Sequence, residues 1–171
     1  MNTNSRQLLS LSPRAKNLLK AIEELRLEPY DDQTGENILA WVEGATIGYG
    51  HLISIDDWDK FKDGITVDQA DQLFSNDLIP FVNAVNRRVE IELSQNQFDA
   101  LVLFAFNIGV GGFERSSALK LINDPSAITI YPNLEAAWKA WNKSQGKVMQ
   151  GLISRRNAEW NIYYNNIYRR W

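Results

Sequence analysis

The segment FDALVLFAFNIGVGGF, residues 98–113, constrains the fold of this chain more than any other stretch. Apolar residues recur on every side of the helix that it would form, and such a helix has to be buried among other elements. The residues just before it, Ser94-Gln95-Asn96-Gln97, have the pattern of a capping box, which marks the start of a helix. We therefore expect a buried central helix and a domain built around it.

Capping and spacing patterns predict further helices on both sides of this segment. Ser12-Pro13 is typical of an N-cap followed by proline at the first helical position, and opens a helix that should run to about Glu24. A second capping box at 66–69 opens a helix to about Val89, which Pro80 should kink or split. The remaining predicted helices cover residues 117–122, about 134–141, and a last stretch with apolar or amphipathic side chains at steps of three or four from Leu152 to Trp171.

The rest of the composition narrows the class of protein. Residues 26–54 are rich in Gly, Tyr, Thr and β-branched residues, which predicts turns and short strands, so the expected fold class is α+β and mostly helical. The chain of 171 residues is most simply one domain, in one or two lobes. It has no cysteine and one histidine, so disulfides, thiolate chemistry and a multi-histidine zinc site are excluded.

Charge and hydropathy limit the partners. The net charge of -3 argues against nucleic acid, and no run approaches the ~18 apolar residues of a membrane span. Residues 28–77 hold twelve acidic side chains against two lysines, whereas residues 139–171 hold seven basic side chains against one glutamate. This asymmetry has two interpretations: two solvated faces, or an acidic lobe facing a basic lobe across a cleft.

Two carboxylates near the N-terminus have the properties of a catalytic pair. Glu23 follows Leu19 by one turn and adjoins Ile22, so it should lie at the edge of an apolar face, where burial raises the pKa of a carboxyl. Asp32 lies in a polar turn that should keep it ionised. Two carboxyls with separated pKa values are the standard pair for cleaving a glycosidic bond. The structural alternatives are a pair between Glu23 and Arg26, and a turn capped by Asp32.

Four segments then resemble one family in its own order: IEELRLEPYDD, TIGYGH, LSQNQFDALVLFAFNIGVGGF and GLISRRNAEW. They resemble the bacteriophage lysozyme (endolysin) family, glycoside hydrolase family 24, nearly throughout the chain from Leu18 onward. The resemblance implies a lysozyme-like fold with a small β-hairpin lobe at about 24–65 and an interlobe helix at about 66–89. A larger helical lobe would comprise about 90–171 and the N-terminal helix.

The resemblance also implies an activity and the residues for it. Family members are muramidases that hydrolyse the β-1,4 bond between N-acetylmuramic acid and N-acetylglucosamine in peptidoglycan, with inversion and without a cofactor or metal. Their motif is a glutamate, eight residues, an aspartate, five residues and a threonine. Glu23 and Asp32 match this spacing; Thr46 matches by its TIGYGH context, although thirteen residues separate it from Asp32. By resemblance, Glu23 is the general acid, Asp32 orients or deprotonates the water, and Thr46 helps to hold it.

Supporting residues follow from the same resemblance. His51 should form a structural ion pair with Asp77 at the acidic start of the interlobe helix. Arg155, or its neighbour Arg156, should reach Glu23 from the last helix and fix its geometry; the alternative is that both are surface arginines. Other departures are Glu24, where the family usually has glycine, and an acidic sequence pI of 5.2.

Two further residues leave their roles open. Asn107 ends the apolar helix, and either contacts substrate or makes a structural hydrogen bond. The tract ENILAWVEGA, residues 36–45, includes the eight additional positions, and its apolar run Ile38–Val42 has the length of a strand. We expect a lengthened β-hairpin with alternating faces. Trp41 would then lie against the small lobe, as local packing, or at the cleft rim, as a sugar-stacking residue.

The expected partner is therefore the glycan strand of peptidoglycan, with no nucleic acid and a monomeric protein. The N-terminus lacks the apolar region of a secretory signal. We expect synthesis in the cytoplasm of the bacterial host without signal or anchor, and action on peptidoglycan in the periplasm or cell wall after release. The alternative function is a non-catalytic peptidoglycan-binding or scaffold module of lysozyme fold. A wall amidase is disfavoured because amidases usually need zinc with several His or Cys ligands.

Overall fold

The computed structural model describes residues 7–171, and the chain divides into two compact units. Unit 2 is Leu19–Ile79; unit 1 contains the chain up to Leu18 and Pro80–Trp171. Two helices are shared between the units, namely α1 (Pro13–Ile22) and α3 (Val67–Arg88). None of the described helices is long and apolar enough to cross a membrane.

Unit 2 is built on a small antiparallel sheet with strand order β1-β2-β3. Its strands are β1 (Arg26–Asp31), β2 (Ala45–Gly48) and β3 (His51–Leu52), followed by the short helices η1 (Ile55–Asp57) and α2 (Trp58–Phe61). All four residues of β2 are buried, because this strand lies between its two neighbours. A small core collects around the sheet: Ala45, Ile47 and Ile53, with the partly buried Ile38, Trp41, Trp58, Phe61, Ile65 and Leu73 packed against them.

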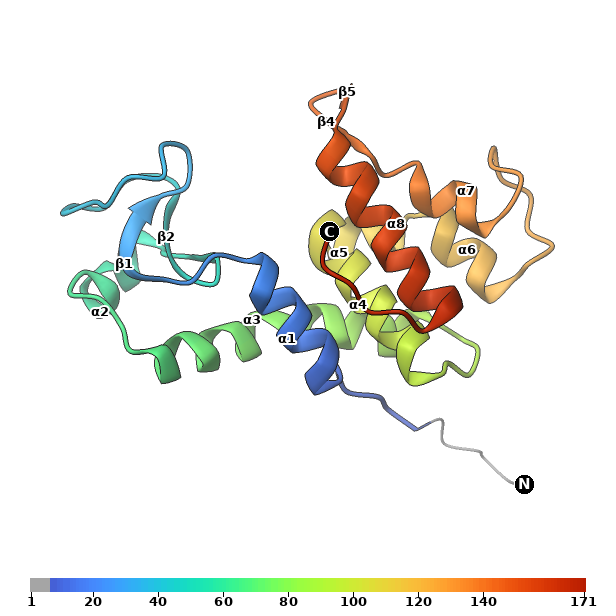
Figure 1. Cartoon of the computed structure of the whole chain (residues 1–171), viewed down its shortest axis with the longest axis horizontal. Coiled ribbons are helices and arrows are strands. Elements are labelled where there is room, and N and C mark those ends of the chain that lie inside the picture. Colours follow the sequence, from blue (N-terminus) through green and yellow to red (C-terminus); the bar gives the residue numbers. More distant parts are fainter. Residues whose placement is uncertain (1–6) are drawn as a thin grey trace. The chain divides into compact units, whose positions relative to one another are not determined.

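The segment between β1 and β2 is a long loop (Figure 1), and the predicted strand at 38–42 is wrong. A single bridge between Tyr30 and Asn37 is its only strand-like pairing among the described residues. Ile38 and Trp41, three positions apart, both turn inward to the core of unit 2, and the Trp41 indole donates to the carbonyl of Ile53 at 2.9 Å. Leu39 is fully exposed. Ile38 and Trp41 therefore anchor a loop to the core at two points. A strand at 38–42 would need a neighbouring strand to pair with.

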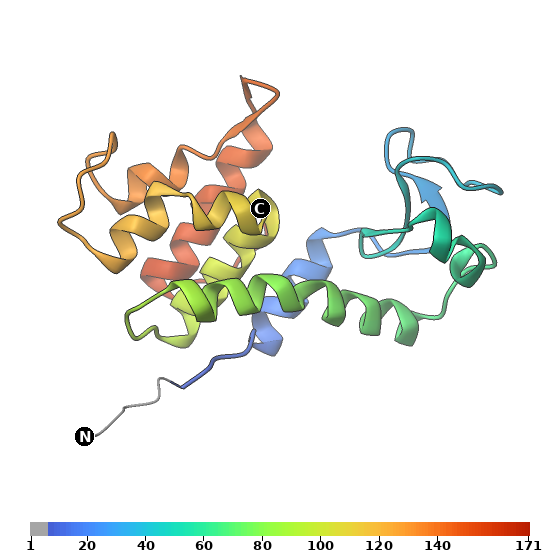
Figure 2. The ribbon, with the colours of Figure 1, turned by 180° about the vertical axis from the view of Figure 1, so that it is seen from behind.

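Unit 1 surrounds the helix that the sequence predicts to be central. This helix, α4 (Gln95–Ile108), begins at the capping box of Ser94 and Gln97, and all eight residues from Phe98 to Ala105 are buried. It packs along α8 (Gln150–Asn165), while α6 (Ser117–Asn123) and α7 (Leu134–Lys139) lie side by side (Figures 1 and 2). The remaining elements are the short α5 (Val110–Glu114) and a two-stranded hairpin of β4 (Lys143–Ser144) and β5 (Lys147–Val148).

One prediction about a helix end and one about a helix interior need correction. The last helix does not reach Trp171: it ends at Asn165, because Asn166 adopts a left-handed conformation with φ 57°. The N–H of Ile167 then donates to the carbonyl of Asn161, which closes the helix end. Of the two outcomes predicted at Pro80, a kink or a split, the split is wrong, since α3 runs unbroken from Val67 to Arg88. The buried apolar face of α3 outweighs the one backbone hydrogen bond that proline removes.

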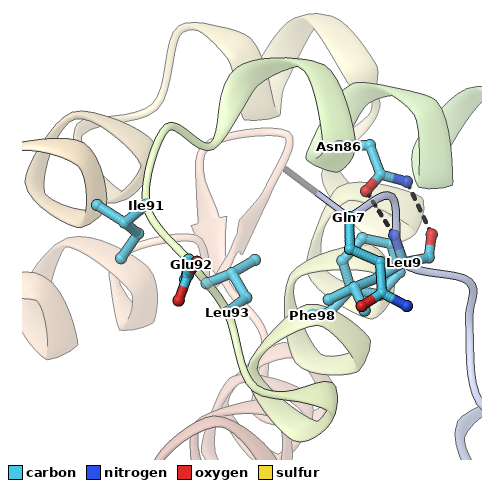
Figure 3. Close-up of a pocket in the computed structure, with 7 residues that line it drawn as sticks. All are labelled: Gln7, Leu9, Asn86, Ile91, Glu92, Leu93 and Phe98. Atoms are coloured by element: carbon cyan, nitrogen blue, oxygen red, sulfur yellow. Dashed lines mark hydrogen bonds between the residues drawn. The ribbon is translucent and has the colours of Figure 1, made fainter. Parts of the chain in front are cut away.

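Polar side chains fix the segment before α1 and the C-terminal tail within unit 1. The Asn86 amide bonds both the N–H and the carbonyl of Leu9, at 3.0 and 2.8 Å, beside a pocket of about 220 Å³ (Figure 3). Asp99, fully buried on α4, accepts from the Ser12 N–H and hydroxyl and from the Tyr168 hydroxyl. Gln95 also donates to Asp99, at 2.9 Å. One buried carboxylate thus joins the start of α1, the first turn of α4 and the C-terminal tail.

Candidate active site

Glu23 lies just beyond the end of α1, at the edge of the apolar face as the sequence predicts. Its N–H donates to the carbonyl of Leu19 at 3.0 Å; Leu19 is fully buried, whereas Glu23 is partly buried. Lys20 anchors this end of the helix through an ion pair with Asp71 of α3 at 2.6 Å. That pairing raises the pKa of Lys20. The backbone that presents Glu23 is therefore fixed by one buried leucine and one ion pair.

Asp32 follows the last residue of β1 and is exposed. Its N–H donates to the carbonyl of Gly44 at 3.1 Å, so the chain is held where the strand ends. The carboxylate of the preceding residue, Asp31, accepts from the N–H of Gln33 at 2.9 Å and caps the turn. The turn-capping role that the sequence left open for Asp32 is thus filled by Asp31.

Thr46 lies on β2 and pairs across the sheet with Tyr30, two residues before Asp32. It is 3% exposed, and its hydroxyl donates to the carbonyl of Gly44 at 2.8 Å. The same carbonyl therefore accepts from the backbone of Asp32 and from the side chain of Thr46. The two predicted water-holding residues meet at one backbone oxygen, despite the thirteen residues between them.

Tyr30 interacts electrostatically with both predicted catalytic carboxyls, and the sequence reasoning did not single it out. Burial raises the pKa of its phenol, Arg26 opposes this, and the charges of Asp32 and Glu23 raise the pKa further. The Arg26 guanidinium lies 4.5 Å from the centre of the Tyr30 ring. Tyr30 is thus within electrostatic reach of both predicted catalytic carboxyls and stays protonated near neutral pH. Its position directly before the two aspartates was the available signal.

His51 contacts the partner that the family resemblance predicts. Its Nδ1 lies 2.9 Å from Asp77 Oδ2 and 3.0 Å from Oδ1, and both side chains are partly exposed. The hydrogen bond with Asp77 raises the pKa of His51, and burial partly opposes this shift. The pair ties β3 to α3 within unit 2. It is geometrically suited to a structural role.

Arg155 and Arg156 share one buried carboxylate in unit 1. Glu159, with no exposed surface, lies 3.0 Å from Arg155 Nε and 2.9 Å from Arg156 Nε. It also accepts from the Trp138 indole at 3.0 Å. Burial lowers the pKa of Arg156, and the charge of Glu159 opposes this. The predicted contact of Arg155 with Glu23 would join the two units, and it stays a prediction.

Asn107 takes part in this buried network. Its Oδ1 accepts from Arg156 Nη2 at 2.6 Å, which supports the structural hydrogen bond that the sequence left open. Asn107 also lines a pocket of about 500 Å³ with Trp141, Lys143 and Met149, among others. A contact with substrate is therefore compatible with the structural one. Among residues 7–171, no group of three His, Asp or Glu side chains could hold a metal ion.

Comparison with known proteins now decides the family. A family model described as phage lysozyme matches residues 20–159. The chain belongs to the phage lysozyme family. An endolysin of Bacillus phage PZA is 38% identical over 151 residues, which are 88% of this chain and 54% of that protein. The chain thus spans about half the length of that relative.

Solved structures of similar proteins agree with the fold. An endolysin from Escherichia coli O157:H7 phage FAHEc1 superposes with a TM-score of 0.73 and 32% identity, covering 96% of this chain and 99% of the other. The muramidase domain of SpmX from Asticaccaulis excentricus superposes with a TM-score of 0.68 and 32% sequence identity, covering 91% of this chain and 97% of the other. The predicted α+β, mostly helical, lysozyme-like fold is confirmed.

Proposed function

We propose that this member of the phage lysozyme family is a muramidase. It hydrolyses the β-1,4 bond between N-acetylmuramic acid and N-acetylglucosamine in peptidoglycan. The observation that carries the proposal is the convergence of Asp32 and Thr46 on the carbonyl of Gly44, in the same unit as the partly buried Glu23. Both carboxyls also act on the pKa of one side chain, Tyr30.

The residues divide the chemistry between them. Glu23 donates its proton to the glycosidic oxygen as the bond from that oxygen to the anomeric carbon breaks. A water held by Asp32 attacks the anomeric carbon from the opposite face, and its proton passes to Asp32. The product is inverted, which requires carboxyls roughly 6.5–9.5 Å apart so that a water fits between. The oxygen of the water becomes the new hydroxyl on the anomeric carbon. Glu23 loses one proton and Asp32 gains one, so the protonation of the enzyme as a whole is unchanged.

Thr46 has a definite hydrogen-bonding role in this scheme. A hydroxyl has one proton to donate, and that of Thr46 points to the carbonyl of Gly44. Toward the water, Thr46 can therefore only accept. Asp32 and Thr46 together accept both protons of the water, which leaves a lone pair directed at the anomeric carbon. The hydrogen bond to the carbonyl of Gly44 fixes the orientation of this hydroxyl.

Several aspects of the biological setting belong to the same proposal. Relatives named as endolysins, and a muramidase domain of similar structure, support peptidoglycan as the substrate. The protein acts as a monomer on glycan strands, without nucleic acid. It is made in the cytoplasm of the bacterial host and reaches the wall after release, for example through a holin pore.

Analysis of the digestion products tests the function. Purified peptidoglycan is incubated with the protein, and soluble muropeptides are identified by mass spectrometry after borohydride reduction. A muramidase yields fragments that end in reduced N-acetylmuramic acid. NMR of a fresh digest should show the α-anomer first if the reaction inverts. Fragments ending in reduced N-acetylglucosamine, or free stem peptides, would assign a different hydrolase. Binding to sediment without release of fragments would favour the non-catalytic module.

A further inference from the structure

Gly44 occupies the point where the predicted water-holding residues meet. Its carbonyl accepts from the Asp32 N–H at 3.1 Å and from the Thr46 hydroxyl at 2.8 Å. Its φ is +93°, in the region that favours glycine. These facts alone would make Gly44 a turn residue with a useful carbonyl.

The space beside its α-carbon adds a second requirement. A Cβ at position 44 would lie 2.3 Å from Oδ1 and 3.2 Å from Cγ of Asp32, and 3.5 Å from Oδ1 of Asp31. The first distance is far below any real contact, so one of the two side chains would have to move. The Asp32 carboxylate thus lies directly against the bare α-carbon of Gly44. Any side chain at position 44 displaces the group that holds the water.

Other glycines with positive φ lack this feature. Gly35 has φ +74° and Gly50 has φ +90°, yet a Cβ on either would meet nothing within 4 Å. Both are needed for backbone conformation only. Gly50 matches Gly44 in φ within a few degrees, and it is therefore a control that separates backbone strain from displacement of Asp32.

The backbone around the loop explains how Gly44 tolerates the additional residues. At one end, the N–H of Asp31 donates to the carbonyl of Glu36, and that of Gly35 to Asp31. At the other end, the N–H of Ala45 donates to Val42, directly beside Gly44. These hydrogen bonds hold both ends of the loop that contains the additional residues, so the loop begins and ends at fixed positions next to Asp32 and Gly44. The contacts of Asp32 and Thr46 are then set by Gly44 and not by the number of residues between them.

From these observations we infer that Gly44 is a positioning residue: its bare α-carbon seats the Asp32 carboxylate, and its carbonyl orients the Thr46 hydroxyl, so that both accept from the attacking water. This inference rests on the proposed muramidase function. It assigns Gly44 no contact with substrate, and its effect should therefore appear in turnover more than in binding.

Gly44→Ala and Gly50→Ala are compared by kcat and KM on soluble peptidoglycan fragments. Gly44→Ala should lower kcat about 10²-fold, the cost of a misplacement of about 1 Å, with KM nearly unchanged. Gly50→Ala carries the same φ strain and should keep kcat within about threefold. Equal losses of kcat in both variants would overturn the inference, because strain would then explain the effect.

A double-mutant cycle of thermal stability tests the contact between Gly44 and Asp32 without relying on activity. Melting temperatures are measured for the wild type, Gly44→Ala, Asp32→Ala and the double variant. Asp32→Ala removes the atoms that a Cβ at position 44 would meet, so Gly44→Ala should cost less in that background, close to Gly50→Ala in the wild type. Equal costs in both backgrounds would refute the seating of Asp32 on Gly44. A wild type without muramidase activity would refute the proposed function, and the cycle would still report on the contact.

Discussion

Asp31 and Asp32 are adjacent and chemically identical, yet the fold gives them different tasks. Asp31 caps a turn through the N–H of Gln33, whereas Asp32 is exposed and rests against Gly44. The spacing from Glu23 could select Asp32 from the sequence, because family spacing is a pattern along the chain. The role of Gly44 could not be selected, since it depends on a φ value and on a distance between residues twelve positions apart. Tyr30 differs from Gly44, because its position directly before the two aspartates was a signal in the sequence.

At this scale, the ion pair of His51 and Asp77 predicts a pH-dependent stability. The folded pKa of His51 is raised above its ordinary value near 6.5. Its stabilising contribution is therefore fully present below about pH 6.5, and it is lost as pH rises through the folded pKa. Asp77→Asn should lower the free energy of unfolding by up to about 1 kcal/mol at pH 5, as for other partly exposed pairs, and by less at pH 9.

Urea unfolding of the wild type and Asp77→Asn at both pH values measures this difference. An NMR titration of the single histidine gives the folded pKa directly. A His51 pKa at or below ~6.5, or the same loss of stability at pH 5 and pH 9, would contradict the ion pair.

Secondary-structure elements were predictable where a local signal marks them. The capping boxes at Thr66 and Ser94 correctly start α3 and α4, because capping is decided within four residues. The strand at 38–42 was wrong because a strand needs a partner, which the sequence pattern does not reveal. The last helix was extended too far because Ile167 and Trp171 kept helical spacing beyond Asn166, whose left-handed conformation ends it.

The anchored loop at 36–45 predicts a large effect on stability for one of its apolar residues and almost none for another. Trp41→Ala removes a side chain that packs on the core of unit 2 and donates to the carbonyl of Ile53. The free energy of unfolding should therefore fall by about 2 kcal/mol. Leu39 is fully exposed, and Leu39→Ser should change stability by no more than about 0.5 kcal/mol. Thermal unfolding of both variants checks this. Equal effects would show that the loop is not held through Trp41.

The carboxylate of Asp99 connects the start of α1, the first turn of α4 and the C-terminal tail, and its removal should destabilise unit 1. Asp99→Ala leaves the hydroxyls of Ser12 and Tyr168 and the amide of Gln95 without their buried acceptor. The expected loss is about 3 kcal/mol in the free energy of unfolding. Tyr168→Phe removes a single hydrogen bond and should cost about 1 kcal/mol. Chemical denaturation compares the two, and a smaller loss for Asp99→Ala than for Tyr168→Phe would refute this account.

At the scale of the whole molecule, the sequence was most informative. Four segments in family order implied a lysozyme-like fold, and similar solved structures confirm it. Residue order suffices there because the solved structures that this chain resembles in sequence also resemble it in fold. The boundary between the two units, at Ile79 and Pro80, lies inside the unbroken helix α3. Of the two outcomes predicted at Pro80, the split is wrong because helical packing on either side was not visible in the local pattern, and the kink stays a prediction.

In the proposed muramidase reaction Glu23 is the general acid, and a pair of isosteric substitutions tests this role most directly. Glu23 is partly buried, whereas its neighbour Glu24 is exposed. Rates of release of reducing ends from purified peptidoglycan are compared for Glu23→Gln and Glu24→Gln, with circular dichroism to verify folding. Glutamine cannot supply the proton, so Glu23→Gln should lose roughly 10²–10⁴-fold in rate, and Glu24→Gln should stay within about threefold of the wild type. A folded Glu23→Gln protein that cleaves peptidoglycan at nearly the wild-type rate would contradict the account.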